Sequence, residues 1–316
     1  MAEKKNYPNT NQKARLVGHL KEKNLELKQS TIKDTNIPCE VISGDMTVEC
    51  DNGTFKVRVY SQSKKKDGDD NKMFAGIKKI YETYVPAVKT DDGIGEYIDC
   101  DIKMSVSDFV TKENTVSTGV QFSLNSANRV SADTESLFDI DMDAFIRGIH
   151  PEIVNEEETG RILVDVVGVN FAEEAEPYQL IVEEDMADAF DGFWEIGQTV
   201  QITVTPKMVH KGAVKKQQVG FGRAANTRSG YDKLELIIVG GSPAYEEPDD
   251  EETPTKVLQA SYVKELWNAR QLKLENLPKE KAKREAEKNK KDAKANVGKK
   301  KTTAEEPYVD DPSSLF

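Results

Sequence analysis

The strongest chemical signal in the sequence is a run of basic residues, interleaved with aromatic rings, near residue 220. Residues 208–233 read MVHKGAVKKQQVGFGRAANTRSGYDK, and Asp232 is their only acidic residue. Cations spaced in this way can follow a chain of phosphates, and aromatic rings can stack on unpaired bases. An exposed hairpin with lysines on its outer side is the alternative. The pattern predicts a site for single-stranded nucleic acid, made of Lys211, Lys215, Lys216, Phe221, Arg223, Arg228, Tyr231 and Lys233.

A second and weaker cluster of the same kind lies earlier in the chain. Its first three members fall on the polar side of an expected strand, and three consecutive lysines follow. Asp67, Asp69 and Asp70 offset part of that charge, so a charged hairpin tip explains the cluster equally well. The second candidate site for a single strand comprises Lys56, Arg58, Tyr60, Lys64, Lys65 and Lys66.

Residue patterns typical of catalysis are missing from the sequence. His19, His150 and His210 are scattered, and neither a phosphate-binding GxxxxGK[ST] loop nor a GxSxG nucleophile motif occurs. The acids of residues 138–145, FDIDMDAF, alternate and would share one face of a strand, which suits a metal or simply a solvated surface. We therefore expect a protein that is not an enzyme and that has no cofactor and no bound metal.

The elements that must position these residues are mainly β-strands. Around residues 37–130, apolar and polar residues alternate, most regularly from Ile98 to Val106, and this period is typical of antiparallel strands. A helix is expected within residues 71–85, where apolar residues recur at helical spacing. Residues 135–243 repeat the pattern as three strands, a short helix and two strands, which is the order of elements in an OB-fold. The fold class predicted is mainly β, a tandem of small OB-like barrels with short helices.

Changes in composition suggest where these domains begin and end. After residue 244 the chain is acidic and then strongly basic, and residues 258–272 carry apolar side chains at helical spacing, which favours docking on a partner or on the barrels. The predicted organisation is a polar N-terminal arm (1–20), OB-like domains at 21–132 and 133–244, an acidic linker (245–254), an amphipathic helix (255–277), and a Lys-rich disordered tether with an acidic tip (278–316).

Overall charge and cysteine usage constrain the environment. The formal charge of the 316 residues is −12, but residues 256–301 are strongly basic, so the remainder is more acidic than this average suggests. No export signal and no long apolar segment is evident, and the three cysteines form no CxxC pair. We expect a cytoplasmic protein with reduced thiols and no membrane partner.

The last residues of the chain carry a resemblance to a known family. Asp310 and Asp311 precede Leu315 and the terminal Phe316 at the end of the Lys-rich segment. With the order of strands and helices, this resembles the bacterial and phage single-stranded DNA-binding proteins, whose acidic tip ends in Phe. Here Ser313 and Ser314 stand where that family has further acids and a proline.

The resemblance implies a function and partners. The chain would bind single-stranded DNA with little sequence preference during phage DNA replication or recombination, in the cytoplasm of the host. Asp310, Asp311, Leu315 and Phe316 would recruit replication or recombination proteins, and self-association stays open. The alternative is a structural or assembly protein of a virion, built from β-barrel domains.

Overall fold

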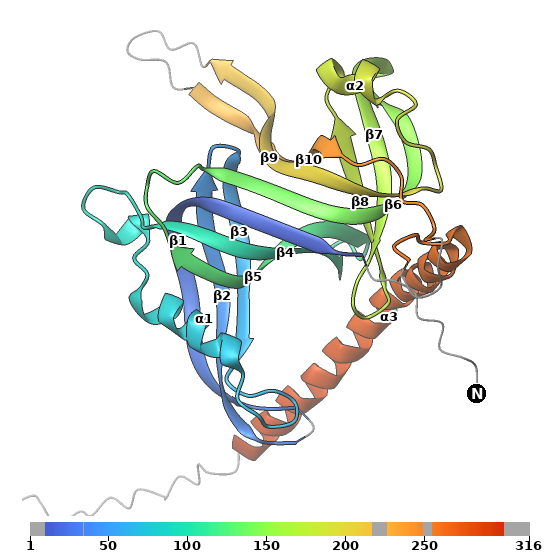
Figure 1. Ribbon diagram of the computed structural model, residues 1–316. Helices are drawn as coiled ribbons and strands as arrows, with labels where there is room; N and C mark the ends of the chain where they lie inside the picture. Colours follow the sequence, from blue (N-terminus) through green and yellow to red (C-terminus); the bar gives the residue numbers. More distant parts are fainter. Residues whose placement is uncertain (1–9, 34, 217–225, 249–254, 300–316) are drawn as a thin grey trace, which may run out of the picture. The chain divides into compact units, whose positions relative to one another are not determined.

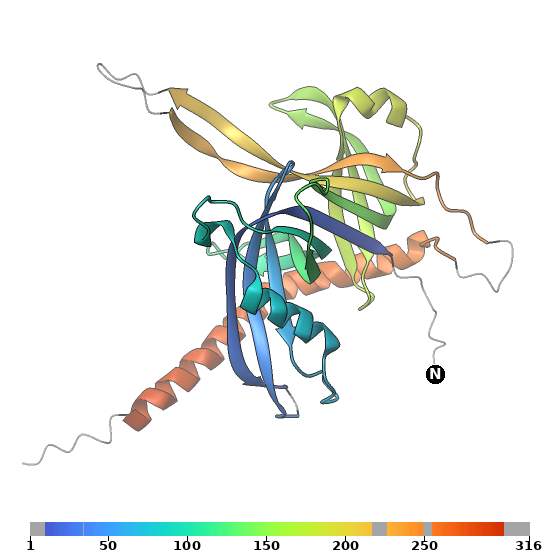
Figure 2. The ribbon, with the colours of Figure 1, turned by 60° about the vertical axis from the view of Figure 1, so that its left-hand side comes forward.

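The computed structural model describes residues 10–33, 35–216, 226–248 and 255–299 (Figures 1 and 2). They belong to two compact units, Met1–Ser107 with Gly119–Arg270, and Asp108–Thr118 with Gln271–Phe316, which are considered separately. The described elements are β1 (Gln12–Thr31), β2 (Pro38–Cys50), β3 (Gly53–Gln62), α1 (Lys72–Thr83), the 3-10 helix η1 (Ala87–Lys89), β4 (Tyr97–Val110), β5 (Val116–Arg129), β6 (Leu137–Val154), β7 (Glu157–Val169), β8 (Ala175–Val182), α2 (Glu184–Phe190), β9 (Thr199–Lys216), β10 (Asn226–Gly241) and α3 (Ala260–Lys299).

Strands β1 to β5 form the first barrel. They follow the order β1-β2-β3-β5-β4 and return to β1, which pairs antiparallel with both β2 and β4. β3 pairs in parallel with β5, and α1 lies in the connection between β3 and β4. A five-stranded barrel with this connectivity is an OB-fold.

Strands β6 to β10 repeat that topology in the second barrel. The order is β6-β7-β8-β10-β9 and back to β6, with a parallel pair between β8 and β10. α2 occupies the position of α1, between the third and fourth strands. The predicted fold class, a mainly β chain with two OB-like barrels and a C-terminal helix, is confirmed.

Alternation along the strands explains why these residues form barrels. On β3, the side chains of Phe55, Val57 and Val59 are buried, while those of the intervening residues point away from the core. The ring of Phe55 packs edge-on against that of Phe138 on β6, with the centroids 4.8 Å apart. Residues from both barrels therefore share one hydrophobic core.

The two barrels are joined by strand pairing. Residues Gln12–Val17 of β1 pair with Leu137–Met142 of β6, so one ten-stranded sheet runs through both barrels. The prediction of a polar arm over residues 1–20 is wrong for residues 12–20, which form the first part of β1. Leu16, Val17 and Leu20 are fully buried there, and burial of these apolar side chains outweighs the polar composition around them.

The beginning of α3 docks on the second barrel, as the apolar spacing predicted. Leu258, Tyr262 and Val263 are buried against an apolar patch formed by Phe145, Val167, Val169 and Ala175. The guanidinium carbon of Arg147 lies 4.3 Å from the centroid of the Trp267 ring, which adds a cation–π contact.

The expected end of this helix at residue 277 is wrong, because α3 continues through Pro278 to Lys299. Proline costs about 3 kcal/mol inside a helix, but the Lys, Glu and Ala residues that surround it are strong helix formers. In the second unit, Lys281 Nζ donates to the carbonyl oxygens of Val110 and Thr111, at 3.4 and 3.3 Å. These contacts hold the end of the β4–β5 hairpin against α3.

Candidate nucleic-acid interface

The basic segment that the sequence singled out is a long two-stranded arm formed by β9 and β10. β9 continues to Lys216 and β10 begins at Asn226, so the described part of the segment consists of two paired strands (Figures 1 and 2). Lys211 pairs with Tyr231 and Gly212 with Gly230, and the ladder continues to Lys216. A Cβ on Gly230 would lie 2.5 Å from the carbonyl oxygen of Lys211, so this glycine allows close approach of the two backbones. The segment extends as an arm because the backbone groups of β9 and β10 are hydrogen-bonded to each other along it.

The structure describes the side chains of only some of the predicted residues of the arm. Tyr231 exposes 68% of its surface, which leaves its ring available to a ligand. Phe221 and Arg223 lie outside the described residues. Lys215, Lys216 and Arg228 have their backbones in the ladder, and their side chains lie outside the described part.

Two of the predicted lysines are held by a buried carboxylate. Glu235 is 3% exposed, and its Oε1 lies 3.0 Å from Lys211 Nζ and 3.7 Å from Lys233 Nζ. Its other oxygen accepts a hydrogen bond of 2.7 Å from Arg161. Burial raises the pKa of Glu235, but the hydrogen bonds from Arg161 and Lys211 outweigh burial and lower it. Lys211 and Lys233 therefore stabilise the base of the arm as well as adding positive charge to it.

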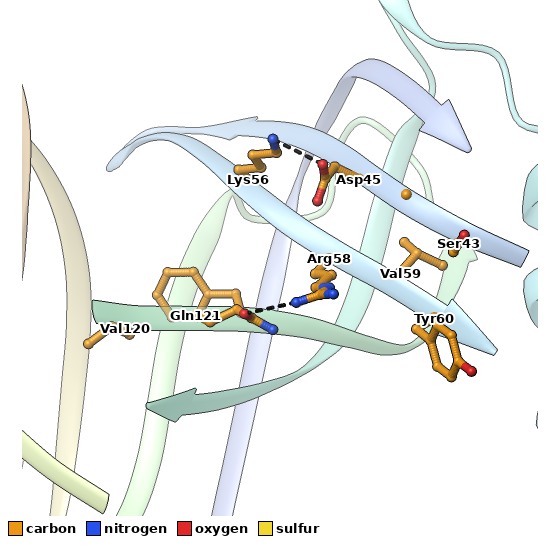
Figure 3. A pocket seen from close by; sticks show the side chains of 10 residues that line it. Ser43, Asp45, Lys56, Arg58, Val59, Tyr60, Val120 and Gln121 are labelled. Atoms are coloured by element: carbon orange, nitrogen blue, oxygen red, sulfur yellow. Dashed lines mark hydrogen bonds and ion pairs between the residues drawn. The ribbon is translucent and has the colours of Figure 1, made fainter. Parts of the chain in front are cut away.

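The second candidate site, on β3, is the one for which the structure describes more of the predicted side chains. Lys56, Arg58 and Tyr60 project from the outer face of β3 beside an open hollow of about 550 Å³, which β2 and β5 also line (Figure 3). Tyr60 is 60% exposed, and its hydroxyl oxygen accepts a 2.7 Å hydrogen bond from Gln62. That contact directs the phenol and leaves the ring faces accessible.

The two cations of this face differ in their partners. Lys56 Nζ lies 3.0 Å from Asp45 Oδ2 on β2, as Figure 3 shows. Arg58 donates a long hydrogen bond of 3.4 Å to Gln121 on β5, and no carboxylate among the described residues pairs with it. The guanidinium of Arg58 is thus free to bind an incoming anion, since a single hydrogen bond leaves most of its five N–H donors unused.

The three lysines that follow β3 belong to a compact turn. Lys64 Nζ donates a 2.7 Å hydrogen bond to the carboxylate of Asp70, which raises the pKa of Lys64. Lys65 and Lys66 are exposed at the tip, next to Asp67 and Asp69. The turn therefore contains positive and negative side chains close together. Arg58, which has no carboxylate partner among the described residues, is the better candidate for binding an anion on the first barrel.

The base of the arm contacts the first barrel, which the sequence did not reveal. Met208 on β9 donates its backbone N–H to the carbonyl oxygen of Asn52, at 3.0 Å, in the turn between β2 and β3. The base of the arm consequently lies beside the β2–β3 turn, where β3 begins, whereas Lys64, Lys65 and Lys66 follow the opposite end of β3. Sequence spacing holds no signal for this contact, because the two residues lie far apart in the chain.

The equivalent outer face of the second barrel has a different character. Asp165 on β7 accepts hydrogen bonds from Arg147 and from Gln179, both at 3.2 Å. Next to it, Val167 and Ala175 are covered by the beginning of α3. On this face the acid is engaged by neighbouring side chains and the apolar patch is covered by α3. It therefore presents fewer groups that could contact a single strand than the face of the first barrel does.

The three alternating acids of β6 take part in internal hydrogen bonds. Asp139 and Asp141 accept hydrogen bonds from Thr205 and Thr203, and Asp143 accepts one from Tyr245. Within the described ranges, no group of three His, Cys, Asp or Glu side chains is arranged to hold a metal ion. The residues predicted to form the C-terminal tip, Asp310, Asp311, Leu315 and Phe316, lie outside the described part of the chain. No helix in that described part is both long and apolar enough to span a bilayer.

Comparison with known proteins gives a family and two distant structural neighbours. Wild-type single-stranded DNA binding protein from Thermus aquaticus superimposes with a TM-score of 0.43 at 8% identity, covering 78% of this chain and 100% of that one. A deletion mutant of the same protein gives a TM-score of 0.43 at 8% identity, covering 77% and 98%. No curated protein matches the sequence. The YorF family model matches residues 11–280, and the chain belongs to the YorF family.

Proposed function

We propose that this protein binds single-stranded DNA with little sequence preference, on the outer face of β2, β3 and β5 in the first barrel. One observation carries the proposal: Arg58 and the exposed ring of Tyr60 lie two residues apart on β3, beside an open hollow. Single strands are bound by cations along the backbone and by rings that stack on bases, at roughly 1–3 kcal/mol per base. The face of the first barrel supplies both kinds of group.

The β9–β10 arm extends this site in the proposal. Its contact with Asn52 supports a path from the barrel face onto the arm. Tyr231 and the basic residues Lys211, Lys215, Lys216, Arg223, Arg228 and Lys233, together with Phe221, would then contact further nucleotides. Since phosphate contacts release counterions, the affinity is expected to fall steeply as salt concentration rises.

The proposed role in the cell is based on the sequence of the C-terminus. We propose that the protein coats single strands during phage DNA replication or recombination in the cytoplasm of the host. Asp310, Asp311, Leu315 and Phe316 would recruit partner enzymes, since a terminal ring and negative charge fit an apolar pocket with a basic rim. The resemblance of this tip to that of single-stranded DNA-binding proteins supports the proposal.

Fluorescence anisotropy with oligo-dT and a matched duplex, each at two salt concentrations, tests the proposal. The full-length chain should prefer the single strand, and Arg58→Ala should weaken binding while reducing the salt dependence. Tyr60→Ala should weaken binding without changing the salt dependence. Lys79→Ala, which removes an exposed charge from α1, is the matched control. Absence of binding at low salt, together with ordered self-assembly, would instead support a structural protein of a virion.

A further inference from the structure

A second hollow lies on the same unit, where the two barrels meet. Its volume is about 340 Å³, and it is lined by side chains from β1, β4, β5 and β6 together with the turn between β7 and β8. Both barrels therefore contribute to its wall. The residues that matter for its chemistry are Gln12, Lys103, Asn125, Asp143, Phe171 and Glu176.

Phe171 is the most exposed large apolar residue described, with 90% of its surface accessible. Its backbone belongs to a turn in which Asn170 Oδ1 accepts hydrogen bonds from the backbone N–H groups of Ala172 (2.9 Å) and Glu174 (3.0 Å). A ring this open to solvent can take a stacked base without displacing a neighbouring side chain. Its position at the hollow thus suits a flat, aromatic ligand.

The acidic groups of the hollow accept hydrogen bonds from neutral donors and keep their negative charge. Asp143 accepts hydrogen bonds from Tyr245 (2.7 Å) and from the backbone of Asn11 (3.3 Å). Glu176 accepts from Tyr178 (2.9 Å) and from Asn170 (3.2 Å). Lys103, in contrast, is exposed and makes no ion pair with any residue that the structure describes. The hollow therefore has one exposed ring and one cation that forms no direct ion pair with a described residue, while its two acids are engaged by neutral hydrogen-bond donors.

This second hollow is within reach of the proposed binding face. Arg58 on β3 is level with Ser123 on β5, and β4, which carries Lys103, is the next strand of the sheet. Neighbouring strands are about 4.8 Å apart, so the strands that carry Arg58 and Lys103 are separated by roughly 10 Å. A strand of DNA crossing β3, β5 and β4 would reach Lys103 and then Phe171.

Charge on the outer face restricts the path further. Asp99 and Asp101 on β4, with Asp139 and Asp141 on β6, line a separate hollow that also contains Lys13 and Arg15. Asp101 accepts a hydrogen bond from Asn125 (3.3 Å), which places this acidic region on the side of Lys103 away from the β4–β5 turn. The acids of this region repel phosphates, so we expect the bound strand to pass Lys103 on the side away from them.

We propose that the hollow at Phe171 is a second contact for the same bound strand: it takes one unpaired base on the Phe171 ring, with a neighbouring phosphate on Lys103. This inference rests on the proposed function and extends it, since the second barrel then takes part through its β7–β8 turn instead of through its own strand face. The ligand class is a single-stranded nucleic acid long enough to span both hollows.

Anisotropy titrations with dT oligonucleotides of increasing length test this inference. Phe171→Ala should weaken binding of long oligonucleotides about fivefold or more, as expected for the loss of one stacked base, while very short ones bind unchanged. Phe171→Trp should restore binding. Phe193→Ala removes a ring that is 47% exposed near α2 and serves as the matched control. Lys103→Ala should reduce the slope of log affinity against log salt concentration by about 0.7, the value for one phosphate of a single strand. Lys103→Arg should restore that slope.

The outcomes separate this inference from the proposed function. If Arg58→Ala and Tyr60→Ala weaken binding but Phe171→Ala has no effect at any length, the second contact does not exist and the proposed function stands. If no oligonucleotide binds the unmodified protein, the proposed function itself is wrong. Photocrosslinking with 5-iodouracil in the oligonucleotide gives a direct readout, because Phe171 should be labelled and Phe193 should not.

Discussion

Met208 and Asn52 form the contact that brings the arm to the first barrel. The backbone N–H of Met208 on β9 lies 3.0 Å from the carbonyl oxygen of Asn52, and the two residues belong to different barrels. Next to Asn52, Gly53 has a φ of +130° and leaves room for the Met208 side chain. The position of the arm therefore depends on a turn whose backbone conformation favours glycine.

Gly53→Ala is expected to disturb this contact. The new Cβ would lie 2.7 Å from the Cβ of Met208, and the left-handed region costs a non-glycine residue about 1–2 kcal/mol. Urea unfolding should show a loss of stability of at least that size. Gly76→Ala on α1, where a Cβ meets nothing within 4 Å, is the control and should be neutral or slightly stabilising. Equal midpoints for the two variants would contradict the argument.

Asp45→Asn should tighten binding of single-stranded DNA. The carboxylate lies 3.0 Å from Lys56 and competes with phosphate for it, so its removal frees a cation at the proposed face. The exposed pair contributes at most about 1 kcal/mol to stability, so folding should hardly change. We expect a severalfold gain in affinity and a steeper salt dependence by anisotropy. Glu26→Gln, which breaks the exposed pair with Lys28 on β1, should leave affinity unaltered.

Glu235 should make stability depend on pH in the acidic range. Its folded-state pKa is lowered, so the paired carboxylate stabilises the fold above its unfolded-state pKa of about 4.3, and this contribution is lost as the pH falls through the folded-state value. Glu235→Gln removes the shorter of the two carboxylate contacts of Arg161, leaving the one to Glu152 at 3.3 Å, and should cost about 1–3 kcal/mol at pH 7.

Denaturant unfolding at pH 7 and near pH 3 measures this effect. The difference between the wild type and Glu235→Gln should shrink at the lower pH. Asp232→Asn, on the same strand but 64% exposed in its pair with His210, should cost little at either pH. A difference that is independent of pH would show that the hydrogen bonds of Glu235, and not its charge, stabilise the arm.

The docking of α3 should depend on the buried Leu258 and not on the exposed Leu272. Leu258 is 2% exposed against the second barrel, and Leu258→Ala should cost about 2–5 kcal/mol and increase hydrogen exchange in the first turns of α3. Leu272→Ala removes the same atoms from a side chain that is 60% exposed and should have little effect. Equal exchange in both variants would contradict the docking.

Removal of residues 305–316 should tighten binding of single-stranded DNA at low salt. These residues are acidic and would compete with phosphates for the basic arm. The effect should fade as salt rises, because screening weakens interactions between exposed charges. An affinity that is the same with and without these residues at low salt would exclude the competition.

Much of the fold could be predicted from the sequence, because its signals are local. Alternation from Ile98 to Val106 predicted β4, and the order of three strands, a helix and two strands predicted the topology of the second barrel. Residues 12–20 were missed because their apolar side chains do not alternate regularly: β1 packs there between β4 and β6. The helix beyond Pro278 was missed because the Lys-rich composition after residue 277 predicted a disordered tether.

The sequence by itself determined the strand-forming periodicity, the barrel topology and the residue types capable of contacting a single strand. The tertiary structure alone decided which of those residues are neighbours and which are left exposed. It paired Lys211 and Lys233 with Glu235, left Arg58 without a carboxylate partner among the described residues, and brought Phe171 to the hollow that contains Lys103. The physical reason is that side-chain periodicity is a property of neighbours in the chain, whereas charge pairing and the shape of a surface depend on residues that only folding brings together.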